Sequence, residues 1–194
     1  MATLIILQCS GLKVSGGELL PINDTFADTL QPTRILIQKK NGLIINPNLF
    51  MPAYLRYGTN QMGNNGGRLY THLNWNDTIQ PSIDSGNVFI VIISALYGLI
   101  EYDTPILNYD LNITSSKRAW LQNNLLKTTL SDYINARPQI TQVLSFLSSQ
   151  YYSVLDDFHK IAPLNQAEYI GNKWIRYDRG ANVATLLNNH FVET

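Results

Sequence analysis

Residues 88–111 read VFIVIISALYGLIEYDTPILNYDL, and this stretch decides the fold class. It opens with an unbroken apolar, mostly β-branched run from Val88 to Ile93. A strand without a polar side is typical of a sheet covered by helices on both faces, so we expect a central parallel strand. The run ends at Ser94 and the chain turns at Gly98. Because ligands of open α/β sheets bind outside the carboxyl ends of the strands, a binding site is expected there.

The rest of the chain alternates short apolar runs with helical patterns. Further strands are expected at residues 3–7, 140–147 and 173–177, with a helix as an open alternative for 140–147. Helices are expected at residues 24–41 with a break at Pro32, 48–57, 117–136, 154–161 and 181–191. This alternation predicts an α/β fold, a three-layer α/β/α sandwich with a mostly parallel central sheet of about four strands. The length of 194 residues, without repeats or a linker, predicts one domain over residues 1–194.

Composition narrows the classes of function. Only 14% of the residues are charged and the formal net charge is zero, so no overall field attracts the chain to nucleic acid or a membrane. Cys9 is the single cysteine, which excludes a disulfide framework or a cysteine-based zinc site within one chain. The first eight residues lack the basic and long apolar segments of a signal peptide or spanning helix. A cytoplasmic protein without a membrane partner is therefore expected.

Polar and small residues collect at the expected strand ends. The first loop, residues 8–17, contains three glycines, two serines and a lysine, so its backbone can approach an anion or a polar ring closely. A glycine-rich connection with a solvated lysine remains an alternative of equal weight. The predicted substrate-binding residues at these ends are Cys9, Ser10, Lys13, Tyr97, Gly98, Ser149, Tyr151 and Arg179. Their convergence on one sheet edge predicts a pocket.

Several kinds of chemistry lack support in the sequence. The histidines, His72, His159 and His190, stand alone, without the spacing of metal ligands. The Gly-x-Ser-x-Gly sequence of serine hydrolases is missing. Cys9 is either a nucleophile with a lowered pKa or a small buried side chain. An aromatic and basic group, Arg68, Tyr70, His72 and Trp75, either stacks on bases or anchors its loop to the core.

Cleavage of an N-glycosidic bond needs neither a metal nor a cofactor, and none is expected. A carboxylate stabilises the cationic sugar or steers water, and hydrogen bonds accept the charge that leaves with the base. The predicted catalytic residues are Asp110, Tyr109 and Ser94, with Tyr97 beside them. For Asp110 the alternative is a capping or turn carboxylate ahead of Asn112.

Two motifs resemble those of a known family. Residues 93–100 (ISALYGLI), followed by 104–106 (TPI) and 108–111 (NYDL), resemble the signature of small bacterial and phage proteins related to the YaaA peroxide-stress family. Residues 7–13 (LQCSGLK) are similar to the segment that opens those proteins. Asn108 stands where the family usually has a proline. The loops that carry out uracil excision in true uracil-DNA glycosylases are not found, so their mechanism cannot be transferred residue by residue.

The resemblance implies a uracil-DNA-glycosylase-like fold, as in the glycosylase-like domain of archaeosine synthase. It implies a DNA glycosylase that flips out and removes a modified base, including hypermodified phage bases in phage defence, with DNA as the partner and no obligate protein partner. Arg179 would contact the DNA backbone. Two alternatives stay open: a DNA-binding or stress-protection protein without enzymatic activity, and an enzyme that acts on free nucleotides.

Overall fold

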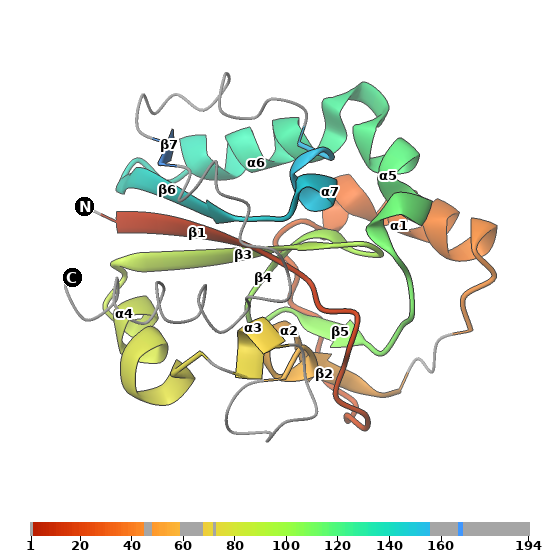
Figure 1. Cartoon of the computed structure of the whole chain (residues 1–194), viewed down its shortest axis with the longest axis horizontal. Coiled ribbons are helices and arrows are strands. Elements are labelled where there is room, and N and C mark those ends of the chain that lie inside the picture. Colours follow the sequence, from red (N-terminus) through yellow and green to blue (C-terminus); the bar gives the residue numbers. More distant parts are fainter. Residues whose placement is uncertain (1, 45–47, 59–67, 72, 156–166, 169–194) are drawn as a thin grey trace.

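A five-stranded, mostly parallel sheet is the centre of the described molecule (Figure 1). The computed structural model describes residues 2–44, 48–58, 68–71, 73–155 and 167–168. The sheet has the order β4-β3-β1-β6-β7 and consists of β4 (Gly98–Glu101), β3 (Val88–Ser94), β1 (Ala2–Gln8), β6 (Ile140–Phe146) and β7 (Ala167–Glu168). All neighbours in it are parallel except β3 and β4. The prediction of a mixed α/β fold with a mostly parallel sheet is therefore confirmed.

The predicted buried strands form the core of this sheet. Every residue of β1 is buried, and Ile5 pairs with Ile90 of β3 on one side and with Leu144 of β6 on the other. Val91 to Ile93 are fully inaccessible to solvent. Burial of each such side chain contributes about 1.5–3 kcal/mol, which explains why the apolar runs occupy the sheet centre. The expected strand at 173–177 lies outside the described residues, and β4 was not predicted.

Three longer helices pack together and reach the β4 edge of the sheet. They are α1 (Ala27–Lys40), α5 (Ile113–Leu121) and α6 (Leu125–Asn135); α1 and α6 each contact both α5 and β4. The predicted break at Pro32 is wrong, because α1 continues through it. Pro32 is exposed, while Leu30 and Ile37 are buried on either side of it and hold both halves of the helix in place.

The predicted helix over residues 117–136 is two helices. The first begins earlier, at Ile113, because the Asn112 side chain accepts a hydrogen bond from the Thr114 backbone N–H at 3.0 Å. A single 3₁₀ turn, η3 (Gln122–Asn124), then separates α5 from α6. Asn123 and Asn124 both have φ 54°, in the left-handed region that asparagine tolerates better than most residues, and this breaks the helix.

Short elements complete the described part. A small antiparallel sheet joins β2 (Phe50–Pro52) to β5 (Pro105–Leu107), so the helix predicted over 48–57 is wrong in its first half and is present only as α2 (Ala53–Arg56). The others are α3 (Arg68–Thr71), the π-helix η2 (Trp75–Ile79), α4 (Gln80–Asp84) and α7 (Ser149–Tyr152). Tyr70 and Trp75 are buried, so they anchor this region to the core. No helix in the described ranges is long and apolar enough to span a membrane.

Candidate functional site at the carboxyl ends of β1, β3 and β6

The sheet order places a topological switch point beside β1. From β1 the chain passes to β3 on one side, and it later returns to β6 on the other side (Figure 1). Loops that leave neighbouring strands in opposite directions leave room for a ligand at the carboxyl ends. Here those loops meet directly: the Gln8 side-chain oxygen accepts a hydrogen bond from the Ser148 backbone N–H at 2.6 Å, and Cys9 Sγ lies 3.0 Å from the Tyr151 hydroxyl. Cys9 is buried, as one of its two predicted alternatives requires.

A buried chain of hydroxyl groups connects the end of β3 to the segment after β5. Ser94 Oγ lies 2.7 Å from the Tyr109 hydroxyl, which lies 3.2 Å from the Tyr57 hydroxyl. Ser94 and Tyr57 are fully buried and Tyr109 nearly so. Burial raises the pKa of both phenols well above the ordinary value of 10, so they remain neutral hydrogen-bonding groups. The sequence predicted Ser94 and Tyr109 but not Tyr57, which follows α2 and has no local signal.

Lys13 lies on the Tyr109 ring. Its ammonium nitrogen is 4.1 Å from the ring centroid and is buried without a hydrogen-bond partner in the described part of the chain. Burial lowers the pKa of Lys13 below 10.5; Cys9 and Asp110 act in the opposite direction, and the nearby Arg56 cation lowers it further. The lysine is therefore not the solvated side chain that one interpretation of the first loop expected.

Ser10 provides a second donor of the same kind. Only 1% of its surface is exposed, and its hydroxyl also lacks a hydrogen-bond partner among the described residues. A buried polar group without a partner costs about 1–3 kcal/mol. Two such groups three residues apart, on a loop that follows the central strand, are typical of a site that supplies their partners through a ligand.

Asp110 is exposed, whereas its neighbour Tyr109 is buried. The carboxylate is close enough to Lys13 to raise the pKa of that lysine. The alternative of a helix cap does not apply, because Asn112 caps α5. The alternative of a turn carboxylate stays open, and Asp110 lies exposed next to a site whose cation is buried.

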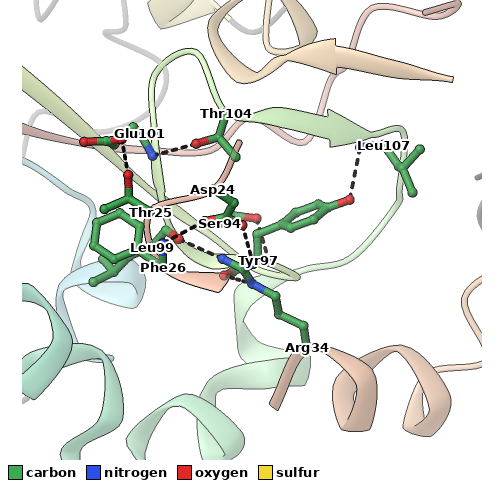
Figure 2. A network of polar contacts seen from close by, with 10 residues as sticks. All are labelled: Asp24, Thr25, Phe26, Arg34, Ser94, Tyr97, Leu99, Glu101, Thr104 and Leu107. Atoms are coloured by element: carbon green, nitrogen blue, oxygen red, sulfur yellow. Dashed lines mark hydrogen bonds and ion pairs between the residues drawn. The ribbon is translucent and has the colours of Figure 1, made fainter. Parts of the chain in front are cut away.

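The buried ion pair between Arg34 and Asp24 holds the backbone at Tyr97, as Figure 2 shows. Arg34 pairs with Asp24, and its other nitrogens donate hydrogen bonds to the backbone oxygens of Tyr97 at 2.7 Å and Leu99 at 3.1 Å. The Tyr97 hydroxyl in turn accepts a hydrogen bond from the Leu107 N–H at 3.0 Å. Its ring meets the Tyr109 ring edge-on, with 5.6 Å between centroids. The backbone at Tyr97 is therefore held by Arg34, which the sequence did not place in the site, and the Tyr97 side chain is held by Leu107 and Tyr109.

The other predicted residues differ in position. Gly98 has φ 72°, and a Cβ there would lie 2.9 Å from Leu126 and 3.0 Å from Trp120, so close packing on α5 and α6 requires this glycine. Ser149 is exposed at the start of α7, and Arg179 lies outside the described residues.

Searches of known family models and of curated proteins find no match to this chain. The described residues contain no group of three or more His, Cys, Asp or Glu side chains that would hold a metal ion.

Proposed function

We propose that the protein is an N-glycosidase that releases a modified base from DNA. The observation that carries this proposal is the order of charges in the site: Lys13 and Ser10, two buried donors without a hydrogen-bond partner among the described residues, lie inside, and the exposed Asp110 carboxylate lies outside. Cleavage of an N-glycosidic bond separates charge in the same order, because the leaving base becomes negative and the sugar becomes positive. A base held inward and a sugar held outward would meet the charge that each develops.

The remaining side chains fit the same role. The fixed rings of Tyr97 and Tyr109 would shape the space for a base, and the neutral hydroxyls behind them would hold its edge. Asp110 would stabilise the cationic sugar and steer water to it. Lys13 would give a proton or a hydrogen bond to the departing base. A base in a duplex must be flipped out first, at a cost of a few kcal/mol.

The family relationship belongs to this proposal. The motifs that resemble those of YaaA-related proteins, residues 93–100 and 7–13, coincide with the carboxyl ends of β3 and β1, around which the site is built. A mostly parallel sheet with α1, α5 and α6 packed together supports, at the coarse level, the proposed three-layer α/β/α arrangement of the uracil-DNA-glycosylase type. The hypermodified bases of phage DNA are the substrates to test first.

An enzyme for free nucleotides is the second candidate. The formal net charge of zero favours it over tight binding to a duplex, because neutralisation of phosphates by an excess of Lys and Arg is the usual source of DNA affinity. Binding of a free nucleotide would raise the melting temperature of the protein, whereas DNA would have little effect.

The decisive experiment is to incubate the protein with unmodified and hypermodified DNA and to identify released bases by mass spectrometry. We expect a free base from at least one modified DNA and its loss in Asp110→Asn, which keeps the size of the side chain but removes the charge. Asp132→Asn is the matched control, because Asp132 is an exposed carboxylate on α6.

Three other results would contradict the role of Asp110, the enzymatic activity or the DNA substrate, respectively. Full activity of Asp110→Asn would remove the carboxylate from the mechanism. Salt-dependent DNA binding without any released base would favour a binding protein without enzymatic activity. Absence of DNA binding, with stabilisation by nucleotides, would favour the second candidate.

A further inference from the structure

We propose that Lys13 is also a nucleophile, which forms an imine with the abasic sugar and cleaves the DNA strand on its 3′ side. This inference rests on the proposed function, since it uses the same site and its product. It adds a second activity, that of an abasic-site lyase, and it requires a substrate that is a strand rather than a free nucleotide.

The surroundings of the Lys13 amine favour its neutral form. Lysine becomes a nucleophile when it loses its proton, which happens where burial or a second cation disfavours the charged form. Both causes act here: the amine is buried, and Arg56 is close enough to lower its pKa further. Cys9 and Asp110 oppose them, and the net direction is still downward. Tyr109, below the amine, has a raised pKa and adds no negative charge.

No hydrogen bond from the described residues occupies the Lys13 nitrogen. Arg56 uses its terminal nitrogens on the backbone oxygens of Val14, Gly16 and Leu49, so it is tied to the scaffold. Lys13 has no hydrogen-bond partner in the described part of the molecule. Its contact with the Tyr109 ring positions the amine without occupying the electron pair that the neutral form carries. A lysine that held the loop together would donate hydrogen bonds, as the terminal nitrogens of Arg56 do, although the Arg56 Nε also lacks a hydrogen-bond partner among the described residues.

The reaction balances without an oxidant, a reductant or a metal. Base release takes a proton from Lys13 and leaves a neutral amine beside C1′ of the sugar. The amine adds to the C1′ aldehyde of the opened sugar, and the resulting carbinolamine takes up a proton from Asp110 or from water as it loses water, which gives a protonated imine. Removal of a proton from C2′ to water or to Asp110 then drives out the 3′ phosphate as the C3′–O bond breaks. Water finally hydrolyses the imine and restores the lysine.

The test uses the whole protein and an oligonucleotide with a preformed abasic site, single-stranded and in a duplex, in the presence of sodium borohydride. Hydride reduces the imine to a stable amine, so a covalent protein–DNA adduct forms and is seen by gel electrophoresis. Because no base has to be released, this experiment separates failure of the lyase from failure of the glycosidase. We expect an adduct whose attachment point, found by peptide mass spectrometry, is Lys13.

Two variants make the result specific to the amine. Lys13→Met and Lys13→Arg should both lose the adduct, and Lys13→Arg keeps a cation at the site. Lys39→Met is the matched control, because Lys39 is exposed on α1 and should leave the adduct unchanged. No adduct with wild-type protein, an adduct mapped to another amine, or an undiminished adduct in both Lys13 variants would overturn the inference.

A pH profile gives a further readout. Because the pKa of Lys13 is lowered, its neutral fraction at a given pH exceeds that of an exposed lysine. Adduct formation should therefore reach its plateau at a lower pH than the same reaction of a free lysine derivative with the abasic oligonucleotide. A plateau at the pH of the free derivative would overturn the inference.

Discussion

Arg34 and Lys13 are two basic side chains at the same end of the sheet, and they are held in opposite ways. Arg34 has a buried carboxylate partner in Asp24 and two backbone oxygens as acceptors (Figure 2). The Lys13 amine lies on an aromatic ring and has no hydrogen-bond partner within the described ranges. A buried cation is costly unless it is paired. The paired arginine therefore serves the fold, whereas under the proposed function the lysine, which lacks a hydrogen-bond partner among the described residues, is available to bind a ligand.

The residues at this end of the sheet fall into two groups, a hydrogen-bonded scaffold and a part that the proposed function makes reactive. The scaffold contains Arg34, Asp24 and Gly98, and it fixes the segment that carries Tyr97. The reactive part contains Lys13 and Ser10, whose donors lack partners in the described molecule. Substitutions in the scaffold should destabilise the fold, whereas substitutions in the reactive part should leave its stability unchanged or increase it.

The largest loss of stability is expected for Arg34→Met. It leaves the Asp24 carboxylate, 4% exposed, without its cation and removes two hydrogen bonds to backbone oxygens. Loss of one partner of a buried ion pair costs about 3–5 kcal/mol. Urea denaturation followed by circular dichroism measures this change in the free energy of unfolding.

A double variant separates the ion pair from the volume change. Arg34→Met with Asp24→Asn contains no unpaired charge, so we expect it to be more stable than Arg34→Met alone. Equal instability of the two variants would show that the ion pair is not what holds the scaffold together.

Gly98→Ala should have the next largest effect. The added Cβ would lie 2.9 Å from Leu126 and 3.0 Å from Trp120, at a backbone φ of 72° that alanine disfavours. A left-handed residue costs about 1–2 kcal/mol and overpacking about 1–3 kcal/mol, so we expect a loss of about 2–5 kcal/mol in the free energy of unfolding. Additional truncation with Leu126→Ala relieves the close contact. The double variant should therefore lose less stability than the sum of the two single variants, and strict additivity would contradict the packing argument.

These scaffold residues also show where sequence reasoning ends. The strands at 3–7 and 88–93 were predictable because continuous apolar runs have few other places to lie. The strand at 140–147 was predicted from a partial alternation of apolar and polar residues, which left a helix as an alternative. The polar groups at the strand ends were predictable because each apolar run stops where its strand leaves the sheet. Cys9 and Ser94 indeed lie at the ends of β1 and β3. Local pattern alone is enough for such residues.

Other features depend on contacts between distant segments. Arg34 is one of several charged residues in α1, and its partners Tyr97 and Leu99 lie more than sixty residues away. Tyr57 reaches Tyr109 across fifty-two positions of the chain. Pairing with β5 likewise draws residues 50–52 into a strand against their helical pattern. No local pattern carries this information, so the arginine, the second tyrosine and β2 had to come from the structure.

Ser94→Ala tests the buried hydroxyl chain between scaffold and reactive part. Its hydroxyl bonds with the Tyr109 hydroxyl at 2.7 Å and accepts from the Tyr97 N–H at 3.0 Å. Removal leaves buried polar groups short of a partner, for which we expect a loss of about 2 kcal/mol in the free energy of unfolding.

Tyr57→Phe is the matched variant for the hydroxyl chain, because Tyr57 is at its end and Tyr109 keeps its bond to Ser94. Its loss should be about 1 kcal/mol. A larger loss for Tyr57→Phe than for Ser94→Ala would place the centre of the network at Tyr57 instead of at Ser94.

The smallest effect has the opposite sign: Lys13→Met should stabilise the protein by about 1 kcal/mol at neutral pH, a gain typical of substitutions that relieve strain in a functional site. The pKa of Lys13 is lowered from 10.5 in the folded protein, so between the lowered value and 10.5 the unfolded chain binds more protons. The wild-type protein therefore gains stability as the pH rises through that range, and the cost of the buried charge is fully present below it. The advantage of Lys13→Met over wild type should shrink correspondingly in alkaline solution.

Parallel urea titrations at neutral and alkaline pH measure this difference, with the exposed Lys39→Met as a control that shows no such trend. A destabilising Lys13→Met would mean that the amine belongs to the scaffold like Arg34, and the division between the two basic residues would fail.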